Sequence, residues 1–194
     1  MGAVNTEREG SNMKISVIYD SKSGNTKQAA GWIIEGMSSV QDVDARAFSI
    51  NDVDDAFVNE SKGIVIGSPS YCTQMTPDMH AWLLASAAHL ELAGKLGGAF
   101  ATAQYTHGGG ELVIQSILIN ELDYGMLCYS GGSGCGEPYI HMGPVGVNNN
   151  VEAHNSLEYY KDYFVIYGRR FAEKGVEIFD QDKTEMQAEL FSGL

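Results

Sequence analysis

Positive charge is scarce in this sequence of 194 residues, because 12 Lys and Arg face 25 Asp and Glu, for a formal net charge of −13. The field of so acidic a molecule repels phosphate backbones and anionic lipid surfaces. We therefore expect no nucleic-acid partner and no membrane partner. An anionic small ligand would have to be held by local hydrogen-bond donors.

Cysteine is also scarce, and the three that are present, Cys72, Cys128 and Cys135, are spaced by 56 and 7 residues. An odd number at these spacings fits neither a disulfide framework nor a zinc or iron–sulfur site. We therefore expect no metal and a reducing, cytoplasmic location. No apolar run approaches the roughly 18 residues of a membrane span. Residues 1–12 also lack the apolar core of a signal peptide, and we interpret them as a polar arm outside the fold.

The length suits one domain with a sizeable core, and 44% of the residues are hydrophobic. Short β-branched runs alternate along the chain with segments of helical periodicity. Strands are expected at 14–20, 43–48, 62–67, 98–103 and 126–129. Helices are expected at 26–39, 76–92, 111–124 and 151–174, and the segment 51–60 is too short to assign.

This alternation predicts an α/β fold, a parallel sheet with right-handed crossovers and helices on both of its faces. The second run is more polar than the others, which suits an edge strand. Ligands of such sheets bind at the carboxyl ends of the strands, where the strand order reverses. The loops after the first, third and fourth strands are therefore the informative ones.

Two of the predicted helices have a clear buried face. Thr76-Pro77-Asp78 is a typical helix start, with a capping hydroxyl, a proline and an acid in the first turn. In the helix expected at 76–92, one stripe of residues is expected to pack in the core: Met79, Trp82, Leu83, Ser86 and Leu90. In the last helix the corresponding stripe is Leu157, Phe164, Gly168 and Phe171. Lys161, Asp162, Arg169, Arg170 and Glu173 are expected to be solvated.

The loop after the first strand, Ser21-Lys22-Ser23-Gly24-Asn25-Thr26, runs directly into a helix. Its side-chain donors, its glycine and the free N–H groups of the helix start can hold a phosphate with little basic charge. The spacing matches neither a Walker loop nor the dinucleotide fingerprint. The alternative is an ordinary Ser/Asn helix cap.

The other two loops carry aromatic residues and glycines. Residues 68–75 (SPSYCTQM) can pack a flat heteroaromatic ring and offer it backbone amides; the alternative is a proline turn with a surface tyrosine. Cys72 has no neighbouring base and is interpreted as a small loop residue. In residues 104–111 (QYTHGGGE) three glycines permit close approach of a ligand. His107 is a candidate for proton handling, or else a spacer or hydrogen-bonding residue.

Together these segments resemble a known superfamily. IYDSKSGNTKQAA resembles the first-strand and phosphate-loop signature of flavodoxin-like FMN proteins. GSPSYCTQMTPDMHAWL and GAFATAQYTHGGGE resemble, more narrowly, the WrbA type of NAD(P)H:quinone oxidoreductase. The resemblance covers residues 13–175, leaving 176–194 as a C-terminal tail. It implies a flavodoxin-like, doubly wound, five-stranded parallel sheet of order 2-1-3-4-5.

The resemblance also implies where FMN would bind. The phosphate would be held by the first loop and the isoalloxazine ring lined by the second, while the fourth-strand loop would cover the other side of the ring and the ribityl chain. The residues are Ser21, Lys22, Ser23, Gly24, Asn25 and Thr26; Pro69, Ser70, Tyr71, Cys72 and Thr73; Ala103, Gln104, Tyr105, Thr106, His107, Gly108 and Gly109. Three positions depart from the family's pattern: Thr73 for glycine, Gly110 for glutamine and Asp123 for a flavin-contacting histidine.

Residues 130–150 form a long stretch rich in Gly, Pro and Asn. A loop of this length is either functional or disordered. In WrbA-like proteins the corresponding region completes the site in a tetramer, which would make Tyr139 and His141 lid residues; the alternative is an excursion that does not contact the ring. The apolar helix 112–122 suggests a homo-oligomer, a dimer or a tetramer.

Two functions follow from the resemblance. In the first, FMN takes electrons from NADH or NADPH and passes two of them to a quinone-like acceptor, so that no acid–base dyad is needed and the flavin carries the chemistry. The alternative is a flavodoxin-type carrier between proteins, which the charge of −13 would steer toward basic partners. The glycine-rich fourth-strand loop and the long stretch 130–150 favour the enzyme. A hydrolase would need a Gly-x-Ser-x-Gly elbow, which is missing.

Overall fold

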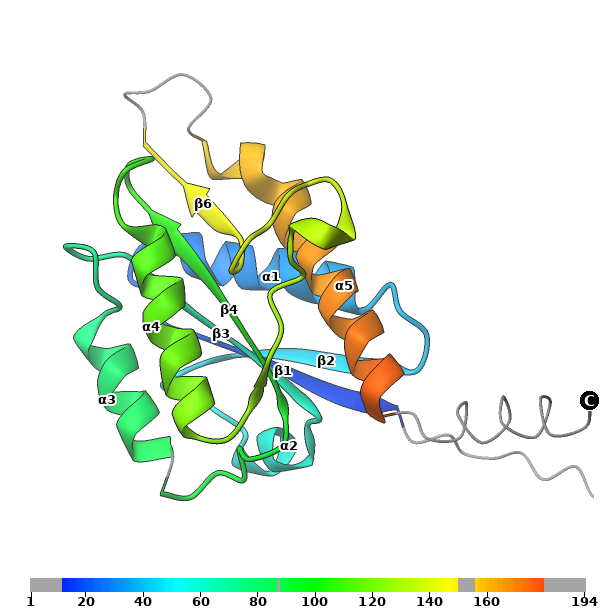
Figure 1. Cartoon of the computed structure of the whole chain (residues 1–194). Coiled ribbons are helices and arrows are strands. Elements are labelled where there is room, and N and C mark those ends of the chain that lie inside the picture. Colours follow the sequence, from blue (N-terminus) through cyan, green and yellow to red (C-terminus); the bar gives the residue numbers. More distant parts are fainter. Residues whose placement is uncertain (1–11, 87, 150–155, 180–194) are drawn as a thin grey trace, which may run out of the picture.

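The chain folds around a parallel sheet of six strands in the order β2-β1-β3-β4-β5, with β6 also paired to β4 (Figure 1). This is a computed structural model, and it describes residues 12–86, 88–149 and 156–179. The strands are β1 (Met13–Tyr19), β2 (Val43–Ser49), β3 (Gly63–Pro69), β4 (Leu96–Ala103), β5 (Leu127–Cys128) and β6 (Val145–Val147). The helices are α1 (Asn25–Met37), α2 (Asp55–Glu60), α3 (Pro77–Ser86), α4 (Gly110–Asp123) and α5 (Lys161–Phe179), with short 3-10 turns at Ser133–Cys135 and Leu157–Tyr160.

Helices cover both faces of the sheet, as predicted. On one face α1 and α5 pack against alternate strand residues such as Ile15, Val17 and Phe100. On the other face α3 and α4 pack against the residues that alternate with them, such as Ile18 and Ile64. Because successive side chains of a strand point to opposite faces, strands buried on both sides must be apolar throughout. The predicted order 2-1-3-4-5 is confirmed.

The fifth strand predicted at 126–129 is present as β5, but it is only two residues long and a sixth strand, β6, also pairs with β4. β5 pairs with Leu96 and Gly97 at the start of β4, and β6 pairs with Ala101–Ala103 at its end. Residues 129–144 leave the sheet between them. The stretch predicted as a long loop therefore contributes a strand, since Val145 and Val147 supply the apolar side chains that β pairing requires.

The predicted start of α3 is confirmed, because the Thr76 hydroxyl accepts a hydrogen bond from the Met79 N–H at 3.1 Å. The helix ends at Ser86, six residues before the predicted end at 92. The last helix begins at Lys161 and continues to Phe179, later at both ends than predicted. Three predictions concern residues outside the described part of the chain. They are the N-terminal arm except residue 12, the helical assignment of residues 151–155, and the C-terminal tail from residue 180 onward.

Arg170 is buried, contrary to the prediction that it is solvated, with a relative exposure of 8%. Its guanidinium donates to the carbonyl oxygens of Cys135, Gly136, Glu137 and Pro138 at 2.8–3.1 Å. Helical periodicity places a residue on a face but does not show that a distant loop covers it. Arg170 thus anchors the segment between β5 and β6 to α5.

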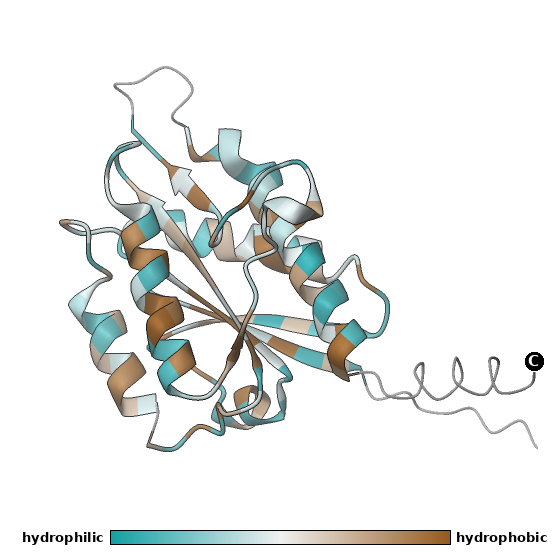
Figure 2. Cartoon of the chain, in the orientation of Figure 1, coloured by the Kyte–Doolittle hydropathy of each residue, from teal (hydrophilic) through white to brown (hydrophobic). Residues whose placement is uncertain are grey.

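Several apolar residues of α4 are exposed to solvent, and Figure 2 shows brown bands along this helix. Leu112, Ile119 and Leu122 have relative exposures of 50–61%, and Leu127 of the neighbouring β5 is 52% exposed. No helix in the described part of the chain is both long and apolar enough to cross a membrane.

Candidate functional site

The loops after β1, β3 and β4 meet at the carboxyl edge of the sheet and enclose a pocket of about 290 Å³. This is the place that the parallel topology predicts for a ligand. The pocket is lined by Ser23, Asn25, Pro69, Ser70, Tyr71, Thr102, Ala103, Gln104 and Asn148. All of these residues except Thr102 and Asn148 were among those expected from the sequence.

In the first loop, Gly24 is the N-cap of α1 and has a left-handed backbone, with φ +93°. It makes no side-chain cap, and a Cβ built at Gly24 would meet no atom within 4 Å. A serine of the same loop does cap the helix, because Ser21 Oγ accepts a hydrogen bond from the Lys27 N–H at 3.3 Å. Open space lies beside Gly24 at the start of α1, where the first N–H groups and the helix dipole favour an anion.

Two other residues of the first loop are tied to neighbouring segments. The buried Thr26 hydroxyl shares a hydrogen bond of 2.8 Å with the Thr102 hydroxyl at the end of β4. Asn25 Oδ1 accepts from Asn148 Nδ2 at 3.0 Å. Thr102 and Asn148 therefore fix the side of the pocket and hold the start of α1 in place.

Lys22 turns away from this pocket. Its ammonium bonds to the Asp78 carboxylate in the first turn of α3 and lies 3.8 Å from Asp20 Oδ1. The hydrogen bond to Asp78, followed by the charge of Asp20, raises the pKa of Lys22. The role of Lys22 as a phosphate ligand stays a prediction. In the structure its ammonium pairs with two carboxylates.

The second loop contains a tight reverse turn, in which Tyr71 and Gln74 exchange backbone hydrogen bonds of 2.9 and 3.1 Å. The two central residues, Cys72 and Thr73, have φ values of 50° and 67°. Such a turn normally has glycine or asparagine at these positions. Tyr71 is 47% exposed and presents its ring at the rim of the pocket.

The third of these loops, after β4, contacts the turn directly. Ser70 Oγ donates to the Gly108 carbonyl at 2.6 Å, and a Cβ on Gly109 would come within 2.8 Å of Thr73. Gly109, with φ +78°, is the N-cap of α4. Glycine is therefore required here by close packing between loops as well as by backbone conformation. Tyr105, Thr106 and His107 are exposed beside it.

Sequence reasoning missed Thr102 and Asn148, although both left a signal. Thr102 is a polar residue near the end of an otherwise apolar strand, and Asn148 opens a run of asparagines directly after β6. The second signal could be interpreted only once β6 was known to pair with the end of β4. The Asn148 N–H then bonds to the Ala103 carbonyl at 3.0 Å, which fixes its position at the pocket.

Three residues considered from the resemblance lie apart from the pocket. Tyr139 and His141 are exposed in the segment between β5 and β6 and do not line it. Asp123 is the last residue of α4, whose first residue borders the site. At about 1.5 Å per residue, a helix of this length separates its ends by roughly 20 Å. Within a single chain, Asp123 is therefore at the opposite edge of the sheet.

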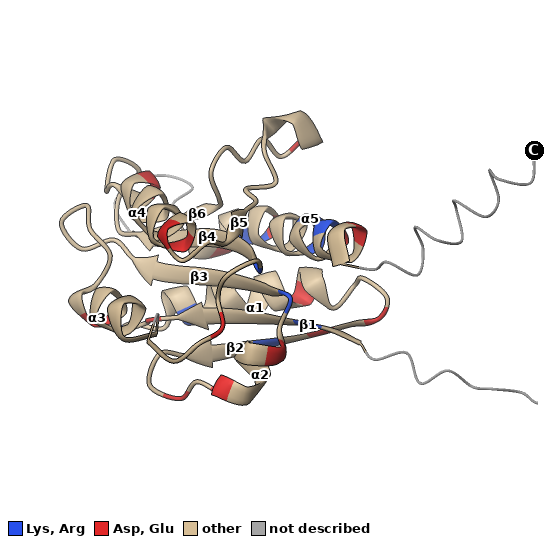
Figure 3. Cartoon of the chain, turned by 60° about the horizontal axis from the view of Figure 1, so that its bottom comes forward, with Lys and Arg blue, Asp and Glu red and all other residues tan. Residues whose placement is uncertain are grey.

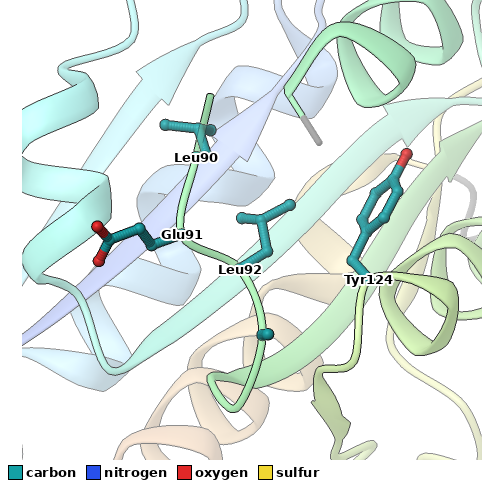
Figure 4. Close-up of a pocket in the computed structure, with 5 residues that line it drawn as sticks. Leu90, Glu91, Leu92 and Tyr124 are labelled. Atoms are coloured by element: carbon teal, nitrogen blue, oxygen red, sulfur yellow. The ribbon is translucent and has the colours of Figure 1, made fainter. Parts of the chain in front are cut away.

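A second pocket of about 350 Å³ lies at that opposite edge, between the chain leading into β4 and the end of α4 (Figure 4). It is lined by Leu90, Glu91, Leu92, Ala93 and Tyr124. The Tyr124 hydroxyl is engaged with the Leu83 carbonyl at 2.8 Å, and Glu91 points away from Tyr124. The larger volume therefore lacks converging polar groups, and we assign the functional site to the pocket between the three loops.

Comparison with known proteins identifies the family of this chain and its relatives of the same fold. No family model matches the sequence. A flavodoxin from Clostridium saccharobutylicum is 37% identical over 86% of this chain and 100% of its own length. Among solved structures, an archaeal flavodoxin matches with a TM-score of 0.63 and 25% identity, over 84% of this chain and 99% of its own. A WrbA-like protein from Agrobacterium tumefaciens matches with a TM-score of 0.66 over 85% of this chain and 98% of its own, at 19% identity, which shows a common fold.

The relative from Clostridium aligns along its whole length, and the fold and the convergence of three loops at the carboxyl edge are those expected from the sequence motifs. The chain belongs to the flavodoxin family.

Proposed function

We propose that this chain binds FMN in the pocket between the three loops and carries electrons between protein partners. The observation that carries the proposal is the start of α1 at Gly24, where a Cβ would meet open space, beside a pocket lined by Ser23, Asn25 and Tyr71. These groups match the two ends of FMN, a phosphate and a flat aromatic ring. Two curated relatives support the choice, since both are named flavodoxins.

The phosphate end fits the first loop. The side chains of Ser21, Ser23 and Asn25 offer neutral donors, and the first N–H groups of α1 add the positive end of the helix dipole. A Cβ at Gly24 would project into open space, so glycine leaves room for a group to approach the backbone. The loop can thus hold an anion even though the molecule as a whole is strongly acidic.

The ring end fits the other two loops. Tyr71 supplies an aromatic surface, and Ala103 and Gln104 at the start of the fourth-strand loop line the same pocket. Bound FMN supplies a ring that can accept electrons and release them again. The residues around it would bind and orient the ring and limit the access of water, while the exposed loop tips leave one edge of the site open to a partner.

The predicted NAD(P)H:quinone oxidoreductase is the second candidate. It rests on the motif resemblance and on the WrbA-like structural neighbour, whose 19% identity extends to the fold alone. In a single chain, Tyr139 and His141 do not line the pocket and Asp123 lies at the far edge. A carrier needs only the flavin site and a surface that attracts its partners, so the carrier has the better support.

The distinguishing experiment is rapid mixing of the FMN-reconstituted protein, without oxygen, with NADH or NADPH and then with benzoquinone. We expect FMN to bind and its absorbance to stay unchanged with either nucleotide, while dithionite bleaches it and a basic haem protein restores it. Fast bleaching by a nucleotide followed by fast recovery with benzoquinone would establish the reductase instead. Failure to bind FMN would overturn both.

The homo-oligomer stays a prediction. Its structural support is the exposed apolar face of α4, formed by Leu112, Ile119 and Leu122. Light scattering of the purified protein across a dilution series measures its mass directly. We expect an oligomer that becomes monomeric in the variant with both Ile119→Lys and Leu122→Lys, whereas a monomeric unmodified protein would contradict the prediction.

A further inference from the structure

Lys22 is the only basic residue of the first loop, yet two carboxylates hold its ammonium. Asp78 bonds to it from the first turn of α3, and Asp20 Oδ1 lies 3.8 Å away at the end of β1. A phosphate that used Lys22 would have to draw the ammonium away from both carboxylates. The contacts of Lys22 thus join two loops of the site.

A buried hydrogen bond runs parallel to this ion pair. The Thr76 hydroxyl donates to Asp20 Oδ2 at 2.5 Å, and Asp20 is only 2% exposed. The Thr76 N–H in turn donates to Ser68 Oγ at 3.0 Å. Asp20 Oδ2 therefore accepts the hydrogen bond from the Thr76 hydroxyl, while Oδ1 faces the Lys22 ammonium. The segment 20–22 is fixed in this way to the beginning of α3.

The segment held at this point leads directly from the pocket-lining turn. The chain leaves β3 at Pro69, makes the reverse turn between Tyr71 and Gln74, and enters α3 at Pro77. Its upstream side is fixed by Ser70, which bonds to Gly108. Its downstream side is fixed by Thr76 and Asp78, through Asp20 and Lys22. The position of Tyr71 thus depends on both attachments.

We propose that Lys22 is a positioning residue for flavin binding, which holds the 69–76 loop against the 21–26 loop through Asp78 and does not contact the FMN phosphate. The inference rests on the proposed binding of FMN in this pocket. On this inference Lys22, the basic residue of the 21–26 loop, affects the 69–76 loop, where the flavin ring would bind. Substitution of Lys22 should therefore weaken the affinity for riboflavin, which lacks the phosphate, by as much as the affinity for FMN.

The test compares FMN and riboflavin affinities of the full chain by quenching of flavin fluorescence, for Lys22→Met, Asp78→Asn and the double variant. An exposed ion pair contributes little free energy, so each single substitution should weaken the binding of both flavins by about two- to fivefold. The double variant should bind no more weakly than Asp78→Asn alone. Lys27→Met, in the first turn of α1, controls for the loss of one positive charge.

Hydrogen exchange of the flavin-free protein supplies a second measurement that does not require a ligand. The amides of Tyr71 and Gln74 are hydrogen-bonded within the turn, so Lys22→Met should speed their exchange and Lys27→Met should not. The inference would be overturned if Lys22→Met weakened the binding of FMN but not of riboflavin, while Asp78→Asn left both affinities unchanged and the exchange rates did not change. Lys22 would then be a phosphate ligand. An unmodified protein that binds neither flavin would contradict the proposed function, and the exchange rates would still test the contact between the loops.

Discussion

At the scale of single residues, Glu121 is the described carboxyl group whose charge conflicts most with its surroundings. It is completely buried beneath β4, and its Oε1 has no hydrogen-bond partner. Oε2 lies 3.6 Å from Cys128 Sγ, and a Cβ on Gly97 would approach it to 2.6 Å. Burial raises the pKa of Glu121 well above 4.5, and the hydrogen bonds from Cys128 and the Gly98 backbone offset only part of this effect.

The raised pKa of Glu121 predicts that the protein loses stability as the pH rises. In the unfolded chain this carboxyl ionises near pH 4.5, whereas in the folded chain it retains its proton to higher pH. Between these two pKa values the unfolded state binds fewer protons, so the free energy of unfolding falls by up to about 1.4 kcal/mol per pH unit. Below pH 4.5 both states are protonated and the contribution is constant.

Urea unfolding from pH 5 to pH 8 checks this, with Glu121→Gln as the comparison. The neutral amide has nearly the same shape and cannot ionise, so the variant should be less sensitive to pH and become the more stable of the two at pH 8. All other titrating groups are shared and cancel in the difference. Parallel pH profiles for the two proteins would show that Glu121 ionises normally.

Gly24 and Gly94 form a natural pair for separating binding from stability. Both have left-handed backbones, with φ +93° and +80°, and a Cβ on either would meet no atom within 4 Å. Gly24→Ala and Gly94→Ala should therefore each cost about 1–2 kcal/mol of stability, the strain of an L-residue in this conformation. Only Gly24→Ala should weaken FMN binding, because only its methyl group would project into the space in front of α1.

Urea unfolding and FMN titration of both variants decide the matter. Equal losses of affinity in the two variants would show that binding follows overall stability and that the space in front of α1 is not the phosphate site. Gly94 lies between the second pocket and β4, so no direct contact with the ligand could explain an effect there.

At the scale of elements, α1 and α5 are held together by glycines that face each other's backbone. A Cβ on Gly36 of α1 would lie 1.9 Å from the Val165 carbonyl oxygen, and one on Gly168 of α5 would lie 2.1 Å from that of Ile33. Backbone atoms cannot move aside as the end of a flexible side chain can. Gly36→Ala should therefore force the helices apart and cost at least about 1–3 kcal/mol.

Gly31 provides the matched control in the same helix, since a Cβ there would meet nothing within 4 Å. Gly31→Ala should stabilise the protein by about 0.5–1 kcal/mol, because alanine loses less backbone entropy than glycine in a helix. Thermal unfolding of the two variants should thus shift in opposite directions. A stabilising Gly36→Ala would mean that the two helices pack less closely than described.

The elements that could be predicted from sequence are those whose signal is local. Three of the first four strands and their helices follow from apolar runs and capping residues, such as Thr76, because both faces of this sheet are covered. The split of the fifth position could not be predicted, because β5 and β6 are held by pairing with β4 and are only two and three residues long. Arg170 was misjudged for a related reason, and the carboxylate partner of Lys22 could not be foreseen, since each finds its partners in segments distant along the chain.

At the scale of the whole molecule, acidic side chains outnumber basic ones, as the red and blue positions of Figure 3 show for the described residues. A net charge of −13 produces a long-range field that attracts basic partners and repels anions. This field attracts a basic protein partner, repels the anion NADPH and has no effect on the approach of a neutral quinone. The salt dependence of electron transfer therefore distinguishes the two candidate functions.

We predict that the rate of electron transfer from the reduced protein to a basic haem protein falls as the ionic strength rises from about 0.01 to 0.15 M. Over this range the Debye length shrinks from about 30 to 8 Å, so attraction between the two molecules is increasingly screened. For association steered by charge, the loss should be at least about tenfold. Transfer to benzoquinone should vary little, which controls for effects of salt on the flavin itself. If the field served a reductase instead, reduction by NADPH would be fast and would accelerate with salt, because screening would relieve the repulsion between two anions.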